Sequence, residues 1–394
     1  MALDNPDLAA LNEADLQTLI TNTVPEGRDL DYKLATYGGR DDDKREFLAD
    51  VSSFANTAGG HLVIGMDEAG GVATALPGVA LDPDAEIRRL DSLARDGLQP
   101  RLLNIRFHFI RLMNGNVAIV VRIPKSWSPP HRVVAQKSNR FWARGAGGKY
   151  EPDVAELKSL FAVAPSLATR VRDFRMERLA KIAASETPLR LSAQSALVLH
   201  VLPVAAFGEA APASIQELWD AHEPCRPMGP IMGSSPAVNL DGVIITAADR
   251  AQGRSAYVQI WRDRRIEAVL TPLVLQRDGM QIVYSGDLER YLIEGLRSYM
   301  SAISALNVSP PFAILVGLVG TAGALLDDPR GGERRFDRAL IVPSELICEG
   351  PASSLTGSNQ AIASFLRPAF DEIANGAGRF HSRNFDAHGN WQVR

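Results

Sequence analysis

Apolar residues recur with two different periods along residues 1–152. Short alternating or continuous apolar runs, such as "DLDYKL" and "HLVIGM", predict β-strands. Apolar residues at helical spacing, such as Phe47, Val51 and Phe54, predict helices, and the segment 104–123 predicts a hairpin that turns at "NGN". Strands and helices that alternate in this way predict one compact α/β domain, an expectation that covers the broader α+β class.

The second half of the chain has its own pattern. Residues 153–187 are helical in pattern and predict a connector, and Pro188 marks the expected domain boundary. Beyond it, runs such as "ALVLHVLPV" and "FAILVGLVG" predict strands, and "DLERYLIEGLRSYMSAI" and "NQAIASFLRPAFDEIA" predict helices. Residues 188–394 are therefore expected to form a second α/β domain, whose last dozen polar residues form a loose tail.

Composition narrows the class of protein. The 394 residues are 46% hydrophobic and 22% charged, which is typical of a globular protein with proper cores. The net charge of −4 means that any nucleic-acid contact has to be a local basic patch. Cys225 and Cys348 have no Cys or His at metal-ligand spacing, so we expect a reducing compartment and no structural zinc. No segment predicts a signal peptide or a membrane span, so we expect a cytoplasmic protein.

Acidic residues gather around the first two predicted strands. Asp31 and Lys33 are two residues apart on a strand and therefore share a face, and Glu26 can approach that face from its end. Asp67 and Glu68 follow the buried strand "HLVIG". Converging carboxylates with one lysine suit a divalent-metal phosphodiester site, because Mg²⁺ and Mn²⁺ prefer oxygen ligands and activate water. The alternative is a solvated strand face with a weak ion pair.

Three motifs in this region resemble a known family. "EGRDLDYKL", "FANTAGGHLVIGMDEAG" and "RFWARGAGG" resemble the Schlafen-type AlbA domain of many bacterial proteins, over about residues 20–160. The resemblance implies a mixed sheet with helices and nucleic-acid binding. It also implies, for nuclease members, three acids at the places of Glu26, Asp31 and Glu68, with Asp67 adjacent. Asp31 stands where Glu is more usual, which shortens the reach by one methylene.

A basic segment could accompany this site. Arg140, Trp142, Arg144 and Lys149 offer cations and an aromatic ring beside a glycine-rich turn, which is typical of a nucleic-acid surface. If the segment is one strand, the first three share a face. The alternative is that Trp142 packs in the core and the arginines form a solvated rim. Further cations without an assigned place are Arg101, Arg106, Arg111 and Arg132.

Other signals predict no additional chemistry. "GAGGKY" lacks the spacing and the Ser or Thr of a Walker A loop, so no ATP is expected, and "GLVGTAG" predicts a turn at a strand end. His200, His222 and His381 are isolated in sequence and are expected to be packing or surface residues.

Two functions from different classes follow. The first is a Schlafen-like endoribonuclease or nuclease that uses Mg²⁺ or Mn²⁺ at a three-carboxylate site. The second is a non-catalytic DNA-binding transcriptional regulator, whose C-terminal domain senses a ligand, forms a homo-oligomer or recruits a partner protein. A pure interaction protein without nucleic acid is a third interpretation. Metal-dependent cleavage separates the first from the second, and salt-dependent binding to nucleic acid separates both from the third.

Overall fold

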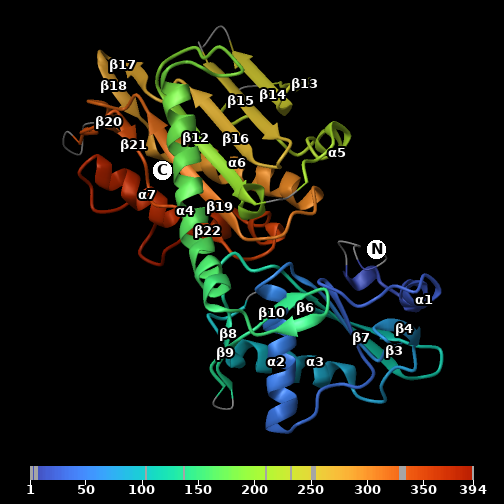
Figure 1. Ribbon diagram of the computed structural model, residues 1–394. Helices are drawn as coiled ribbons and strands as arrows, with labels where there is room; N and C mark the ends of the chain where they lie inside the picture. The colour runs from blue at the N-terminus through green and yellow to red at the C-terminus, as the bar shows by residue number, and fades with distance from the viewer. Residues whose placement is uncertain are drawn as a thin grey trace. The chain divides into compact units, whose positions relative to one another are not determined.

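The computed structural model describes Leu3 and residues 8–102, 104–135, 138–208, 211–230, 233–249, 254–327 and 334–392. The chain divides into two compact units, Met1–Leu167 and Ala168–Arg394. The division falls inside the long helix α4 (Val154–Ala183), drawn in green in Figure 1, whereas the sequence pattern placed it near Pro188.

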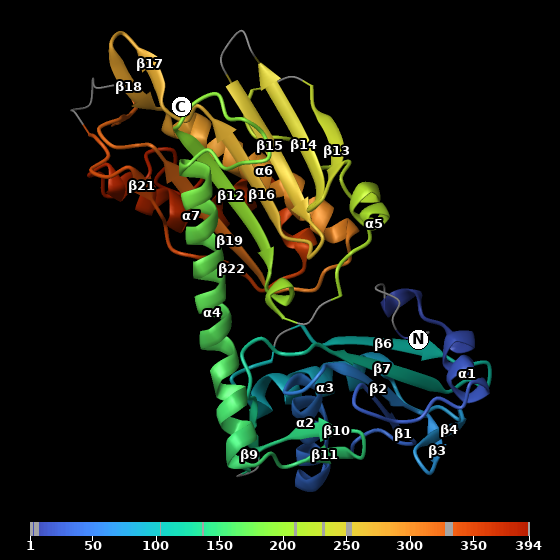
Figure 2. The same cartoon turned by 45° about the horizontal axis from the view of Figure 1, so that its top comes forward.

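A mixed four-stranded sheet forms the centre of the N-terminal unit. Its strand order is β1-β2-β7-β6, with β1 parallel to β2 and the other neighbours antiparallel (Figure 2). The expected mixed sheet and the expected hairpin are both confirmed. The strands are β1 (Leu30–Lys33), β2 (Gly60–Ile64), β6 (Arg106–Arg111) and β7 (Val117–Ile123).

Each face of this sheet has its own core, because successive side chains of a strand point to opposite faces. Leu62 and Ile64 pack with Phe47 and other apolar residues of the helices α2 and α3. Val63 packs on the other face with Leu16 and the rest of the N-terminal segment. The helices are α1 (Glu13–Thr21), α2 (Asp41–Ala55) and α3 (Pro83–Gly97), preceded by the 3-10 helix η2 (Leu8–Ala10).

The segment "RFWARG" is two strands in two different sheets, so the expectation of one strand is wrong. β9 pairs with β8, while β10 pairs with β11. Between them the Trp142 carbonyl accepts a hydrogen bond from the Asn56 side chain (2.8 Å), so it is not part of a strand ladder. The short strands of this unit are β3 (Asp67–Ala69), β4 (Val72–Ala75), β5 (Leu98–Gln99), β8 (Arg132–Val133), β9 (Arg140–Phe141), β10 (Ala143–Gly145) and β11 (Gly148–Tyr150).

An antiparallel sheet forms the centre of the C-terminal unit, in the order β13-β14-β15-β16-β12-β19-β21, with β22 also beside β19. The expected α and β composition is confirmed. The sequence analysis missed β13 and β14, and the residues of β13 are exposed or half-buried and carry no regular alternation. The strands are β12 (Ala196–Pro203), β13 (Ser235–Asn239), β14 (Gly242–Asp249), β15 (Arg254–Trp261), β16 (Ile266–Thr271), β19 (Phe312–Val319), β21 (Leu340–Ile341) and β22 (Leu346–Cys348).

Helices cover both faces of this second sheet. Leu197 and Leu199 pack against the long helices α6 and α7, whereas Val198 packs against Leu179 and Ile182 of α4. In the described part of the chain, no helix has the length and apolar composition needed to cross a membrane. The remaining elements are α5 (Ile215–Asp220), α6 (Ser285–Ala305), α7 (Asn359–Gly376), β17 (Leu275–Arg277), β18 (Met280–Val283), β20 (Leu325–Leu326), η4 (Val204–Phe207) and η6 (Ala352–Leu355).

The C-terminal segment is docked, so the expectation of a loose tail is wrong. The Trp391 indole N–H donates to Glu289 Oε2 (2.8 Å), and the Ser382 hydroxyl donates to Glu289 Oε1 (2.5 Å). Glu289 is buried on α6, and burial raises the pKa of its carboxyl group. A buried carboxyl group needs hydrogen-bond donors, and this segment supplies two of them.

Candidate functional site

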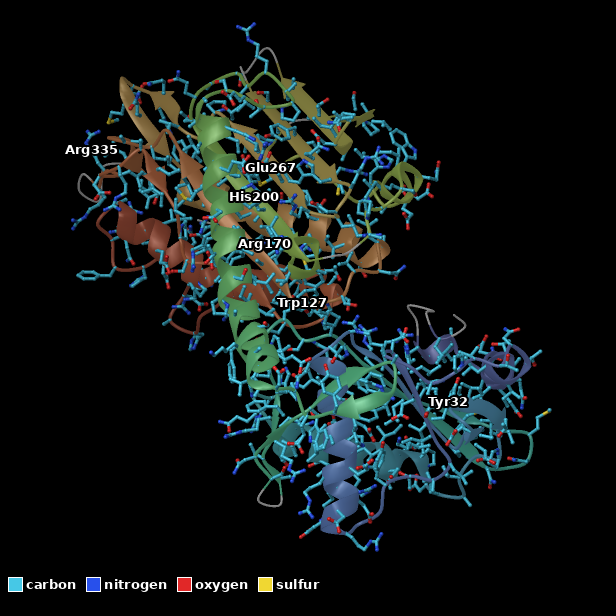
Figure 3. The ribbon with its side chains drawn as sticks, in the orientation of Figure 1. Tyr32, Trp127, Arg170, His200, Glu267 and Arg335 are labelled. Atoms are coloured by element: carbon cyan, nitrogen blue, oxygen red, sulfur yellow. The ribbon has the colours of Figure 1, made fainter. Side chains whose placement is uncertain are left out.

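Glu26 and Asp31 meet at the start of β1. The Glu26 carboxylate accepts the backbone N–H of Tyr32 (2.7 Å), whose place Figure 3 labels. Burial and a hydrogen bond with Asp31 raise the pKa of Glu26 to about 7. Burial also acts to raise the pKa of Asp31, but the hydrogen bond with Glu26 and the charges of Lys33 and Arg144 outweigh it and lower that pKa. Near neutral pH, a proton in this pair therefore resides on Glu26.

Two cations neutralise Asp31. The Asp31 Oδ2 atom lies 2.8 Å from Lys33 Nζ and 3.3 Å from Arg144 Nη1. Arg144 is only 4% exposed, and its Nε donates to the Gly27 carbonyl (2.8 Å). Its guanidinium lies over the Phe54 ring, 4.3 Å from the centroid. Arg144 is thus a buried partner of Asp31, and the expectation that it contributes to an exposed basic face is wrong.

Asp50 on α2 is a member of this site that the sequence reasoning missed. It is 1% exposed, and it accepts hydrogen bonds from the Tyr37 hydroxyl (2.7 Å) and from Lys149 Nζ (2.8 Å). Burial and the charge of Asp50 raise the pKa of Tyr37 well above its ordinary value. The signal was present in the sequence, because Asp50 lies three residues after Phe47 and four before Phe54, on the apolar face of the helix.

The remaining predicted nucleic-acid residues do not form one surface. Lys149 contacts Glu46 as well as Asp50, and its side chain is 19% exposed. Arg140 is exposed and pairs with Glu151 (2.7 Å). Trp142 is half-buried and packs against the core beneath α2. The predicted alternative, a packed tryptophan with an arginine at the rim, is closer to the observed arrangement.

The acids after β2 lie beside this site without completing a metal cage. Glu68 is exposed and accepts the Gly71 N–H (2.6 Å), while the Glu26 N–H donates to the Gly71 carbonyl (2.6 Å). Asp67 is half-buried and accepts the Glu68 N–H (3.0 Å). Across the described ranges, three or more His, Cys, Asp or Glu side chains nowhere gather in a way that could hold a metal ion. The structure therefore brings Glu26 and Asp31 together, with Glu68 on the neighbouring hairpin.

The interacting side chains form a unit that we call the charge cluster. Its six members are Glu26, Asp31, Asp50, Lys33, Arg144 and Lys149. Three acids thus face three bases, and the cluster is neutral when all six are ionised. When Glu26 holds a proton, these six residues carry a net charge of +1, which the exposed Glu46 beside Lys149 offsets. Lys33 and Lys149 are the cluster's partly exposed cations, with side chains 28% and 19% exposed.

The other predicted cations lie on scattered elements. Arg101 is exposed, and Arg132 donates to the Gln99 side chain (2.7 Å). Arg106 and Arg111 are both exposed but occupy opposite ends of β6. They are five residues apart on a strand, so they project to opposite faces and form no shared patch.

A second buried charged group lies in the C-terminal unit, at the positions that Figure 3 labels for His200 and Glu267. The Glu267 carboxylate accepts two hydrogen bonds from Arg178 (2.8 and 2.9 Å) and one from the Tyr257 hydroxyl (2.8 Å). Burial acts to raise the pKa of Glu267, but hydrogen bonds from His200 and Arg178 lower it to about 2. His200 is a packed residue, as expected, and this group fixes α4 on its sheet.

The motifs of the N-terminal unit match a known family. Residues 26–153 match the family model described as Schlafen, AlbA_2. The matched range contains all six residues of the charge cluster. The resemblance found from the sequence motifs is thus confirmed for the N-terminal part of the chain, and the match ends at the start of α4.

Two solved structures are similar to part of the chain at low identity. A crystal structure of the DIP2311 protein from Corynebacterium diphtheriae is 16% identical with a TM-score of 0.27, and the match covers 37% of this chain and 27% of that chain. The solution NMR structure of the N-terminal domain of a RecG-related protein from Nitrosomonas europaea is 22% identical with a TM-score of 0.24. That match covers 35% of this chain and 90% of that chain. The chain thus spans less than a third of the DIP2311 protein. No curated protein matches the chain.

Proposed function

We propose that the protein binds nucleic acid through its N-terminal unit. Lys33 and Lys149, the partly exposed cations of the charge cluster, would contact a phosphate. One observation carries the proposal: three cations surround two buried acids and Glu26, an acid whose pKa is raised to about 7 by burial and by Asp31. The Schlafen, AlbA_2 match supports nucleic acid as the polyanion. The partly exposed ammonium groups of Lys33 and Lys149 can therefore meet a phosphate without a large basic surface.

The positions of Lys33 and Lys149 support their role. Both reach solvent while their charges are held by buried carboxylates, so their ammonium groups are fixed in place before a phosphate arrives. Gly147 lies at the exposed turn of the β10–β11 hairpin, two residues before Lys149, and a glycine turn lets a backbone approach closely. The exposed Arg140 adds a third cation, on the preceding strand β9.

The test is salt-dependent binding by the full chain to labelled single-stranded RNA, single-stranded DNA and duplex DNA. Lys33→Gln in the charge cluster should weaken binding and reduce the slope of log affinity against log salt by about one, and the charge reversal Arg140→Glu should reduce it by roughly one to two, because each phosphate contact releases counterions. Arg140 is exposed, so this change leaves the core intact. Lys158→Glu on α4 is the matched control and should change neither quantity by much more than its effect on net charge. Wild-type protein that binds none of the three probes contradicts the proposal.

A second candidate function, a metal-dependent nuclease, is favoured by the Glu26–Asp31 pair. A bound cation would stabilise these two neighbouring carboxyl groups, because it would relieve the repulsion between their charges. Their oxygen atoms suit Mg²⁺ or Mn²⁺ in kind, with Glu68 and Asp67 on the adjacent hairpin as the further donors. Such an ion would supply activated water when bound. Two converging carboxyl groups are fewer ligands than these ions use, and Lys33 and Arg144 already neutralise Asp31.

Cleavage assays decide between the two. Purified protein is incubated with a panel of RNA and DNA in Mg²⁺, in Mn²⁺ or in EDTA. A nuclease cuts only with metal, and Asp31→Asn and Glu68→Gln each abolish the cut. Lys33→Ala slows it, because that ammonium group would offset charge on the phosphate. Cutting that persists in Asp31→Asn protein, purified in parallel, comes from another site or a contaminant. Binding without cutting leaves the regulator function.

A further inference from the structure

Phe380 in the C-terminal unit is a large apolar side chain that faces solvent. It is 97% exposed and follows the end of α7 by four residues. An exposed aromatic ring is unremarkable on a mobile chain end, where it has no fixed direction. Phe380 is different, because the backbone that carries it is held on both sides.

Hydrogen bonds fix that backbone. The Asn375 side chain donates to the carbonyls of Arg379 (2.8 Å) and Phe380 (3.0 Å). The Arg379 guanidinium contacts Asp327 and the Leu326 carbonyl. On the other side of Phe380, the Ser382 N–H donates to Asp371 Oδ1 (2.9 Å) and the Ser382 hydroxyl donates to Glu289. The backbone on both sides of Phe380 is therefore fixed, so the fold itself places this ring in the solvent.

Two exposed arginines lie close to the backbone that carries the ring. Arg383 and Arg334 are both exposed, and neither forms an ion pair with a residue that the structure describes. The Arg334 Nη1 atom lies 3.8 Å from the position a Cβ would take on Gly378, two residues before Phe380. Of the acids that the structure describes near this segment, Asp327 pairs with Arg379 and Asp371 contacts Arg367 and Ser382.

We infer that Phe380, with Arg334 and Arg383, is a second nucleic-acid contact that binds single strands. An unstacked base presents an apolar face to an aromatic ring, and the phosphates beside it need cations. A duplex offers no free base face to such a ring. This contact lies in the C-terminal unit, outside the range that matches the Schlafen, AlbA_2 family, and it does not depend on the charge cluster.

The experiment measures binding of the full chain to a fluorescein-labelled twelve-residue oligothymidine by anisotropy. Phe380→Ala should raise Kd roughly ten-fold, whereas Phe380→Tyr should restore it, because base stacking needs an aromatic ring. Leu240→Ala is the matched control, since Leu240 is 90% exposed in the same unit, and it should leave Kd unchanged. Arg383→Gln should lower the salt slope by about one.

Three results would overturn the inference. Phe380→Ala protein that binds the oligonucleotide within two-fold of wild type removes the ring from the interface. An equal loss in Leu240→Ala protein shows a general effect of surface changes. Wild-type self-association in sedimentation that Phe380→Ala abolishes, with oligonucleotide affinity unchanged, assigns the ring to a protein contact. Each result is separate from the N-terminal proposal, because Lys33→Gln and Arg140→Glu test that site in the same assay.

Discussion

At the scale of single residues, the proton on Glu26 links stability to pH. The pKa of this carboxyl is raised in the folded protein from 4.5 to about 7, by burial first and by Asp31 second. The folded state therefore binds the proton more tightly than the unfolded state. The resulting stabilisation is complete below pH 4.5 and is lost as the pH rises through 7.

The first prediction compares wild type with Glu26→Gln. The stability of wild type should fall relative to the variant between pH 5 and pH 8, because glutamine stays neutral throughout and keeps no linked proton. Thermal melts at four pH values measure the difference in stability between the two proteins. Titrating groups that both proteins share contribute equally to both and cancel in this difference. Glu151→Gln, at a site whose side chain is 52% exposed, is the control. Parallel melting curves for wild type and Glu26→Gln at every pH would show that Glu26 is not held as described.

The second prediction concerns Asp50, which holds Tyr37 and Lys149. Asp50→Asn should lower the free energy of unfolding by about 1.5–3 kcal/mol, because the buried Tyr37 hydroxyl and the Lys149 ammonium group lose a charged hydrogen-bond acceptor. Asp42→Asn on the same helix should change it by less than about 1 kcal/mol, since that side chain is 85% exposed and forms only a surface pair. Denaturant titration of both variants checks this. Equal effects of the two substitutions would mean that the buried contacts of Asp50 contribute little to the free energy of unfolding.

The sequence predicted part of this site at the residue scale. The Asp31–Lys33 contact followed from the two-residue period of a strand, and Asp50 could have been found as an acid on an apolar helix face. The burial of Arg144 could not, because it depends on the β10–β11 pairing and on the distant Gly27 carbonyl. Burial of a cation is a tertiary property, and local spacing carries no information about it.

At the scale of elements, the second half of α4 packs closely on the C-terminal sheet. Gly317 makes the approach possible, because a Cβ at that position would lie 2.7 Å from Leu179 Cδ2. Leu179 and Ile182 are both almost fully buried. This half of α4 is therefore part of the core of the C-terminal unit, although the sequence pattern predicted only a connector.

The third prediction tests this packing. Leu179→Ala should destabilise the protein by about 2–5 kcal/mol, because it leaves a cavity above Gly317. Lys181→Ala, two residues later with its side chain 41% exposed, should have an effect near zero. Calorimetry of both variants would reveal the difference, and a mild Leu179→Ala effect would indicate that α4 is only loosely attached.

Elements with a clear pattern, including the short strands β1 and β2, were predicted, whereas the eight-residue β14 and most of the short C-terminal strands were not. The helices α2 and α3 and the β6–β7 hairpin follow from periodicity that spans many residues. "RFWARG" was misread because partners elsewhere in the chain, and not its own alternation, split it into β9 and β10. The C-terminal segment was misread because its anchor, Glu289, lies far away in sequence.

At the scale of the whole molecule, the division inside α4 predicts which fragments fold. A fragment of residues 168–394 keeps Arg178 and Leu179 and should unfold cooperatively. A fragment of residues 188–394 loses both, which exposes one face of the sheet and leaves the buried Glu267 without its arginine. We expect this shorter fragment to melt without a sharp transition, as calorimetry would show. A shorter fragment as stable as the longer one would place the boundary near Pro188, as the sequence pattern did.

The docked C-terminal segment also bears on how the protein folds during translation. Ser382 follows Glu289 by 93 residues and Trp391 follows it by 102. The ribosome therefore releases α6 well before either donor exists, and in that interval water or a proton has to satisfy the carboxyl group. The charge cluster closes between Glu26 and Lys149, so the N-terminal unit can finish folding first. The nascent chain thus carries one completed unit and one whose buried acid still awaits its partners.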